Sequence, residues 1–99
     1  MRVVWSPLAL ERVAEIASYI AQDRPQAAAD WADAIFASVL RLESFPESGR
    51  RVPESARPEL REVIHGRYRV IYRVDPDRVM VLTVRHGRQE LQPGDPDLH

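Results

Sequence analysis

The sequence predicts an α+β fold of order β-α-α-β-β-β, in which a helical hairpin packs on a small, largely antiparallel twisted sheet. Apolar residues recur every three or four positions through residues 7–44, which is the period of a helix. From residue 60 to residue 84 they alternate at every second position, which is the period of a strand. Because 99 residues suffice for one core, we expect a single domain over residues 1–88 and a flexible tail over residues 89–99.

The first helix should follow a short strand at residues 2–5. Ser6 is suited to cap a helix, and Pro7 fits the first helical position, where its missing N–H costs nothing. The helix is expected to continue to about Ala21. Its predicted buried stripe consists of Leu10, Val13, Ala17 and Ile20, with Ile16 beside them.

A second helix should begin in the same way at Pro25. Pro46 disfavours helical geometry at the residue before it, so this helix should end near Ser44. A link of about three residues between the two helices predicts an antiparallel hairpin. The predicted buried stripe consists of Ala28, Ala32, Ile35, Val39 and Leu42.

The remaining elements are predicted to be strands. Residues 45–59 contain three prolines and one glycine among polar residues, which indicates an exposed loop. Residues 60–65, 68–74 and 79–84 are rich in β-branched and aromatic residues. Gly66-Arg67 and residues 75–78 supply the turns between them, so the three strands should form an antiparallel meander.

The strand at residues 68–74 alternates sharply between two faces. Tyr68, Val70, Tyr72 and Val74 should meet the helices. Arg69, Ile71 and Arg73 should point the other way, joined by Arg61 and His65 from the neighbouring strand and by the loop containing Arg50 and Arg51. This predicts a basic open face. The alternative is an ordinary solvated face, whose arginines pair with acids such as Glu62.

Composition narrows the class of protein. The net charge is −1, but residues 50–88 carry ten arginines against five acids, while the segments before and after them are net acidic. All fourteen basic residues other than histidine are arginine, a residue suited to bidentate contacts with carboxylates and phosphates. Because the chain has no cysteine and no apolar run long enough to cross a bilayer, we expect a cytoplasmic protein without disulfides.

The end of the last strand carries a candidate catalytic histidine. In Arg85-His86-Gly87-Arg88, His86 could transfer protons near neutral pH, and the flanking arginines could stabilise a phosphoryl oxygen. The alternative is a structural or surface histidine. His65, His86 and His99 show no metal-ligand spacing, and no phosphate-binding glycine loop is present, so we expect neither metal nor cofactor.

Several of these segments occur together in the order and spacing of a known superfamily. They are Trp5-Ser6-Pro7, Ile16 with Tyr19-Ile20-Ala21, Pro25 with Ala27-Ala28, Phe45-Pro46 with Gly49-Arg50, Arg61-Glu62, residues 68–74, and Val84-Arg85-His86-Gly87-Arg88. Over residues 3–88 the chain resembles the RelE/ParE superfamily of type II toxin–antitoxin toxins.

The resemblance implies one of two activities. RelE-like members are ribosome-dependent, metal-independent mRNA endoribonucleases, in which a base, an acid and a basic side chain act on the scissile phosphate. ParE-like members lack that set and inhibit DNA gyrase by stalling it on cleaved DNA. The resemblance therefore implies either DNA gyrase or the ribosome with its mRNA as the target.

Residue by residue, the resemblance favours the ParE-like branch. Arg69 matches the RelE-type phosphate-holding arginine, but ParE-type members also have it. His86 lies close to the RelE acid–base position but out of register, and residues 87–99 contain no tyrosine. If the chain is a ribonuclease, its catalytic residues would be Arg69, His86 and Glu62. If it is ParE-like it has none, and Arg61, Arg69, Arg73, Arg85 and Arg88 would form a basic surface facing the target or the antitoxin.

A cognate antitoxin is the partner that the resemblance implies. It would fold onto the toxin, with an apolar segment on the helical hairpin or with a strand added to the sheet edge. No membrane partner is expected. A third alternative is a degenerate member that has lost toxicity and serves only in a complex that represses its own operon.

Overall fold

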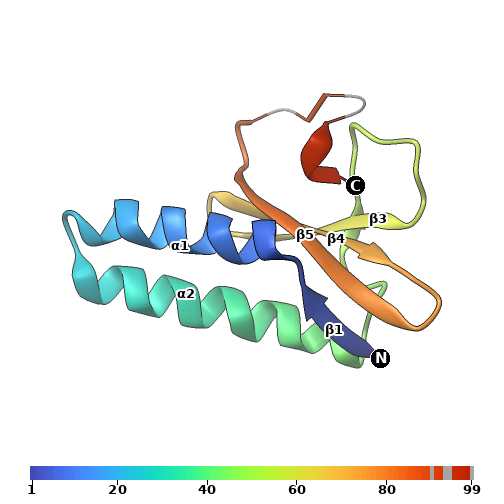
Figure 1. Ribbon diagram of the computed structural model, residues 1–99, viewed down its shortest axis with the longest axis horizontal. Coiled ribbons are helices and arrows are strands. Elements are labelled where there is room, and N and C mark those ends of the chain that lie inside the picture. The colour runs from blue at the N-terminus through green and yellow to red at the C-terminus, as the bar shows by residue number, and fades with distance from the viewer. Residues whose placement is uncertain (90, 93–94, 99) are drawn as a thin grey trace.

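The computed structural model describes residues 1–89, 91–92 and 95–98, and it confirms the predicted α+β fold (Figure 1). The strands form one sheet of order β1-β5-β4-β3-β2. Strand β1 runs parallel to β5, and all other neighbouring pairs are antiparallel. The elements are β1 (Arg2–Trp5), α1 (Pro7–Ala21), α2 (Pro25–Leu40), η1 (Arg41–Glu43), β2 (Arg50–Arg51), β3 (Leu60–His65), β4 (Tyr68–Val74), β5 (Arg78–His86) and η2 (Pro96–Leu98).

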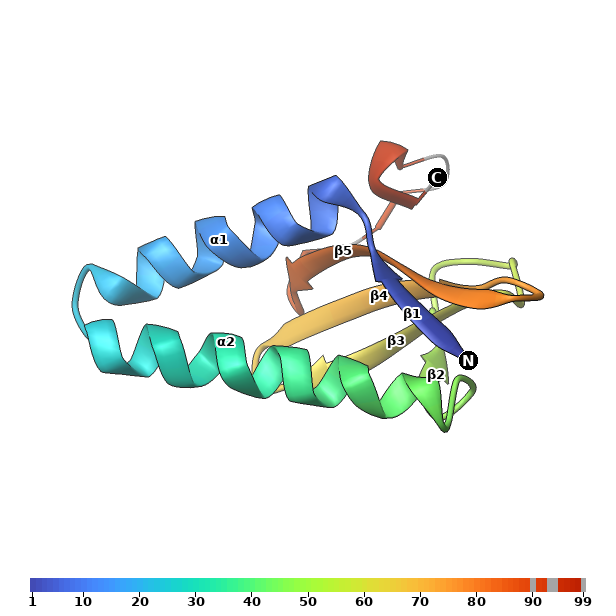
Figure 2. The same cartoon turned by 60° about the horizontal axis from the view of Figure 1, so that its bottom comes forward.

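Both helices begin where the sequence predicts. The Ser6 hydroxyl accepts a hydrogen bond from the Ala9 N–H at 3.0 Å and donates one to the Leu82 carbonyl at 3.0 Å, so the same side chain caps α1 and ties it to β5. Helix α2 gives way to the 3₁₀ turn η1, which ends just before Ser44. The two helices run antiparallel along one face of the sheet (Figure 2).

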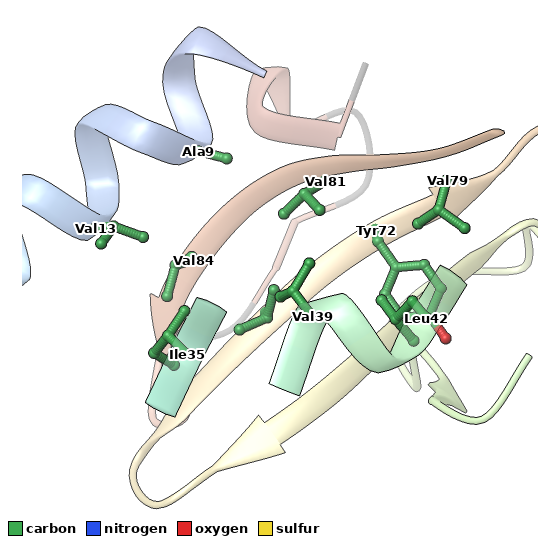
Figure 3. Packing of buried hydrophobic residues seen from close by; sticks show 10 residues of the cluster. Ala9, Val13, Ile35, Val39, Leu42, Tyr72, Val79, Val81 and Val84 are labelled. Carbon is green, nitrogen blue, oxygen red and sulfur yellow. The ribbon is translucent and has the colours of Figure 1, made fainter. Parts of the chain in front are cut away.

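The main core lies between the helices and this face. Its buried members include Val13 from α1, Ile35 and Val39 from α2, Tyr72 from β4 and Val84 from β5 (Figure 3). The predicted stripe of α2 is confirmed by the burial of Ala28, Ile35, Val39 and Leu42. The predicted stripe of α1 was partly wrong. Leu10 is 46% exposed, because the buried face is centred on Ala9 and Val13.

A β-bulge shifts the alternation of β5. Ile71 pairs with Thr83 and Tyr72 pairs with Val81, so Leu82 is the extra residue opposite β4. Because of this extra residue, Val79, Val81 and Val84 all reach the helix-facing core although their spacing changes from two to three. β5 extends one residue before and two residues after the predicted segment.

The opposite face of the sheet carries a second apolar cluster. Ile71, Leu60 and Leu82 pack there with Val52 from the loop, and Leu91 and Leu98 cover them from the C-terminal segment. The prediction of an open face was therefore wrong, and the predicted loop also contributes the short edge strand β2. The domain boundary at residue 88 and the flexibility of residues 89–99 stay predictions, although the described part of that segment lies against the sheet.

Candidate functional site

A buried ion network occupies the place where the sequence suggested a phosphate-binding site. Arg69 projects from β4 onto the second face, and only 6% of its side chain is exposed. Its Nε donates to Glu62 Oε1 at 2.9 Å, and its Nη2 binds the same oxygen. Its Nη1 and Nη2 each donate to one oxygen of Glu54 at 2.8 Å. All three guanidinium nitrogens are therefore engaged by carboxylates.

Local geometry explains why these groups meet. The two-residue turn Gly66-Arg67 has Gly66 at φ +58°, in the left-handed region that glycine tolerates. This turn sets the register in which Glu62 lies opposite Ile71. Glu62 is consequently the diagonal neighbour of Arg69 on the same face of the sheet. Glu54 arrives from the loop, where the Leu91 N–H also donates to its carboxylate at 3.2 Å.

The network holds its charges in place. Hydrogen bonds from Arg69 lower the pKa of Glu54 to about 2, and the bonds to Glu54 and Glu62 raise the pKa of Arg69. The side chain of Glu62 is fully buried, and its second oxygen accepts from Arg50 Nε at 2.7 Å. Neither oxygen of Glu62 is left to take a proton from a substrate, and Arg69 has no nitrogen left to hold a phosphate.

The other arginines of the second face are also neutralised. Arg73 makes two hydrogen bonds to Asp75, the shorter at 2.6 Å, and these bonds lower the pKa of that carboxyl. Arg85 pairs with Asp95 and Asp97, each at 2.9 Å. Burial opposes ionisation of Asp97, yet the bonds from Arg85 lower its pKa overall. The alternative reading, in which arginines pair with acids such as Glu62, therefore describes this face.

Two residues expected on that face lie on the other one. Arg61 pairs with Tyr72, and His65 pairs with Tyr68, so both share the helix side of the sheet. Arg61 donates to the Gly49 carbonyl at 2.8 Å, next to the buried Tyr72 hydroxyl that accepts from the Gly49 N–H at 3.0 Å. Arg61 therefore anchors the loop before β2.

His86 and Arg69 start from opposite faces of the sheet, and both reach an open hollow at the β3–β4 turn. His86 pairs with Tyr68, and the two rings meet edge to face with centroids 5.6 Å apart. Arg69 follows Tyr68 and points to the opposite face. His86 Nδ1 accepts from the Arg88 N–H at 3.1 Å, which leaves Nε2 as its free nitrogen. Of the three candidate ribonuclease residues, Arg69 and Glu62 are bonded to each other, and Glu62 does not line the open hollow that Arg69 and His86 share.

In the described ranges, no cluster of three His, Cys, Asp or Glu residues could hold a metal ion. None of the helices described has the length and apolar character needed to span a bilayer.

Sequence reasoning missed Glu54, which lies in a segment read as an exposed loop. It also missed the apolar cover from Leu91 and Leu98. The one available signal was that Leu60, Ile71 and Leu82 would remain bare on the second face unless some other segment covered them.

Comparison with known proteins identifies the relatives of this architecture. A family model described as "ParE toxin of type II toxin-antitoxin system, parDE" matches residues 3–91. Y4kP of Sinorhizobium fredii, named as a candidate toxin, is 36% identical over an alignment of 91 residues that covers 90% of this chain and 91% of that protein.

Two solved structures share the fold. A chain of the chromosomal ParDE TA system from P. aeruginosa aligns with a TM-score of 0.73 and 19% identity, over 87% of this chain and 95% of its own. A chain of the RelBE2 toxin–antitoxin complex from Mycobacterium tuberculosis aligns with a TM-score of 0.60 and 21% identity, over 86% of this chain and 95% of its own. At these identities the likeness shows the fold alone.

Proposed function

Because this chain belongs to the ParE toxin family of type II toxin–antitoxin systems, we propose that it inhibits DNA gyrase rather than cleaving RNA. The observation that carries this proposal is the complete pairing of Arg69 with Glu54 and Glu62. Stabilising a phosphorane requires guanidinium N–H groups aimed at the reacting phosphate. Here those groups are bonded to carboxylates of the chain itself.

The partner of the proposed toxin is a cognate antitoxin that masks it. Large apolar residues remain exposed on the outer surfaces of both helices, among them Leu10 on α1 and Phe36 and Leu40 on α2. An amphipathic antitoxin segment could cover such residues. The unpaired edge of β1 could accept an additional strand. We expect the toxin to act and to be neutralised in the cytoplasm, and free toxin to arrest growth.

A supercoiling assay with purified gyrase tests the proposal. Added toxin should block supercoiling of a relaxed plasmid and leave linear DNA after the protein is denatured, and antitoxin should abolish both effects. A translation reaction with ribosomes and mRNA serves as the parallel arm. Cleaved mRNA with unaffected gyrase would make the RelE-like alternative correct, and inactivity in both arms would indicate the degenerate member.

The double variant Arg69→Met/Glu62→Leu distinguishes a structural role of Arg69 from a catalytic one. Replacing a buried ion pair by apolar residues of similar volume is often tolerated, whereas removing one partner is not. The double variant should therefore fold and still inhibit gyrase. If Arg69 held a scissile phosphate, a folded double variant would lose all activity of the toxin.

A further inference from the structure

The end of the sheet at the β3–β4 turn brings together two arginines that are far apart in the sequence. The Gly87 N–H donates to the Arg67 carbonyl at 2.6 Å, which joins the turn to the segment after β5. A Cβ on Gly87 would lie 3.2 Å from that carbonyl oxygen, so a larger residue at this position would crowd the contact. Arg67 and Arg88 therefore both lie next to the hydrogen bond that joins these two segments.

These two arginines differ from the others in the second half of the chain. Of the ten arginines in residues 50–88, six have ion-pair partners, and Arg51 and Arg61 bind backbone carbonyls. Arg67 and Arg88 are exposed, and within the described ranges their side chains make no ion pair or hydrogen bond. As far as the described residues are concerned, their charge is available to another molecule.

An open hollow of about 530 Å³ lies between them. Arg50 and Arg69 also line it, and the acids that these two bind are Glu54 and Glu62. Four arginines against two carboxylates leave an excess of two positive charges. Arg50 contributes to the open surface, because 59% of its side chain is exposed. His86 lines the hollow as well, with Nδ1 already bonded and Nε2 able to donate.

We propose that this basic end of the sheet, defined by Arg50, Arg67, His86 and Arg88, binds the phosphodiester backbone of the DNA on which gyrase acts. The inference rests on the proposed function for its choice of DNA. Guanidinium groups and an imidazole N–H around an open hollow are suited to phosphate oxygens, and such contacts position a protein without reading base sequence.

The same features disfavour an antitoxin peptide as the occupant. An amphipathic segment needs apolar anchors, and Ile64 and Tyr68 are the apolar and aromatic residues that line this hollow. Of the exposed large apolar residues, Ile64 lines the hollow, whereas Leu10, Phe36 and Leu40 lie on the helices and do not. One exposed apolar residue among the exposed Arg50, Arg67 and Arg88 suits an anionic polymer better than an amphipathic peptide.

Salt dependence of DNA binding tests the inference. Anisotropy of a short fluorescent DNA duplex is measured with the full chain at several salt concentrations. The slope of log K against log salt is about −0.9 per phosphate contacted, so three arginine contacts give about −2.7. A fourfold rise in salt should then weaken binding about 40-fold for the wild type, but only about fourfold for Arg67→Ala/Arg88→Ala.

Matched variants control for charge and folding. Arg2→Ala/Arg24→Ala removes the same charge from exposed positions that do not line the hollow, and it should keep the wild-type slope. Arg67→Lys/Arg88→Lys keeps the charge and should also keep the slope. Antitoxin binding by each variant verifies that it is folded.

The outcomes separate this inference from the proposed function. If Arg67→Ala/Arg88→Ala keeps the wild-type slope, or loses antitoxin binding while still binding DNA, the DNA site is wrong even if the toxin inhibits gyrase. Preference for a single-stranded RNA probe of equal length would also overturn it. If the slope falls as expected while gyrase is unaffected, the DNA site is correct and the proposed function fails.

Discussion

Replacing Arg69 by methionine tests the reading of the buried network as structural. Methionine keeps an apolar stem in the space of the arginine but removes all three nitrogens that bind Glu54 and Glu62. The fully buried Glu62 would retain only Arg50, which is mostly exposed and can be hydrated. Removing one partner of a buried ion pair costs about 3–5 kcal/mol, because the remaining charge stays out of water.

The surroundings of Glu54 and Glu62 narrow the expected loss of stability. Glu54 is 25% exposed and can turn towards water, so its lost pairing adds only about 0–1 kcal/mol. Because Glu62 keeps its contact with Arg50, the loss of stability that comes from Glu62 should lie near the lower end of the about 3–5 kcal/mol range. We therefore expect Arg69→Met to reduce the free energy of unfolding by about 3–4 kcal/mol, a large part of the about 5–15 kcal/mol typical of a domain.

Urea unfolding followed by the fluorescence of Trp5 and Trp31 measures this loss, since both indoles pack against the main core. Arg73→Met is the matched control on the same strand and face. It breaks a pair with the partly exposed Asp75, so its cost should be about 0–1 kcal/mol. A loss below about 1 kcal/mol for Arg69→Met, or equal losses for both variants, would refute the structural reading of Arg69.

Three side-chain contacts and the antitoxin complex provide the remaining predictions. The lowered pKa of Glu54 stabilises the fold above its usual value near 4.5, and this contribution is lost as the pH falls towards 2. The pKa shift sets an upper limit of about 3 kcal/mol, which partial exposure of the pair reduces to about 1 kcal/mol. Glu54→Gln should flatten that part of the stability–pH curve in urea titrations, and an unchanged curve would contradict it. Tyr72→Phe leaves the buried Gly49 N–H without its acceptor, so it should lower the free energy of unfolding by about 1–3 kcal/mol in the same assay. No change in stability would mean that water takes the place of the hydroxyl. Leu98→Ala should cost about 2 kcal/mol if the C-terminal segment stays on the sheet, whereas a flexible tail predicts no measurable cost. The complex with antitoxin should melt well above the free toxin in calorimetry, and equal melting temperatures would argue against an antitoxin that binds the folded chain.

The sequence predicted the elements and the inner core well because both depend on local periodicity. On β4, the alternation of Tyr68, Val70 and Tyr72 is sufficient to identify the face that meets the helices, and all three contact the main core. Along β5, apolar residues occupy both faces, so alternation says nothing about the bulge at Leu82. The bulge depends on how β5 fits its neighbour, which is not a local property.

The second face was mispredicted because its cover comes from distant segments. The two-residue period of a strand assigns Arg69, Ile71 and Arg73 to one face of β4. It does not say which other parts of the chain reach that face. Leu91 and Leu98 reach Ile71 over a separation of about twenty residues or more, through a segment whose Pro and Asp content resembles a frayed tail. The apolar residues on the predicted open face indicated that another segment of the chain must pack against them.

Part of the ion network could nevertheless have been derived from the sequence. A two-residue turn at Gly66-Arg67 places His65 opposite Tyr68, and counting back along both strands makes Glu62 the diagonal neighbour of Arg69. An acid at that position within reach of an arginine on the same face is enough to question a phosphate-binding role. Glu54 could not be found in this way, since its position depends on a loop. An arginine shared by both branches of the superfamily can therefore hold a phosphate or hold the fold together, and the carboxylates around it decide which; in this chain two carboxylates bind it, which favours the fold.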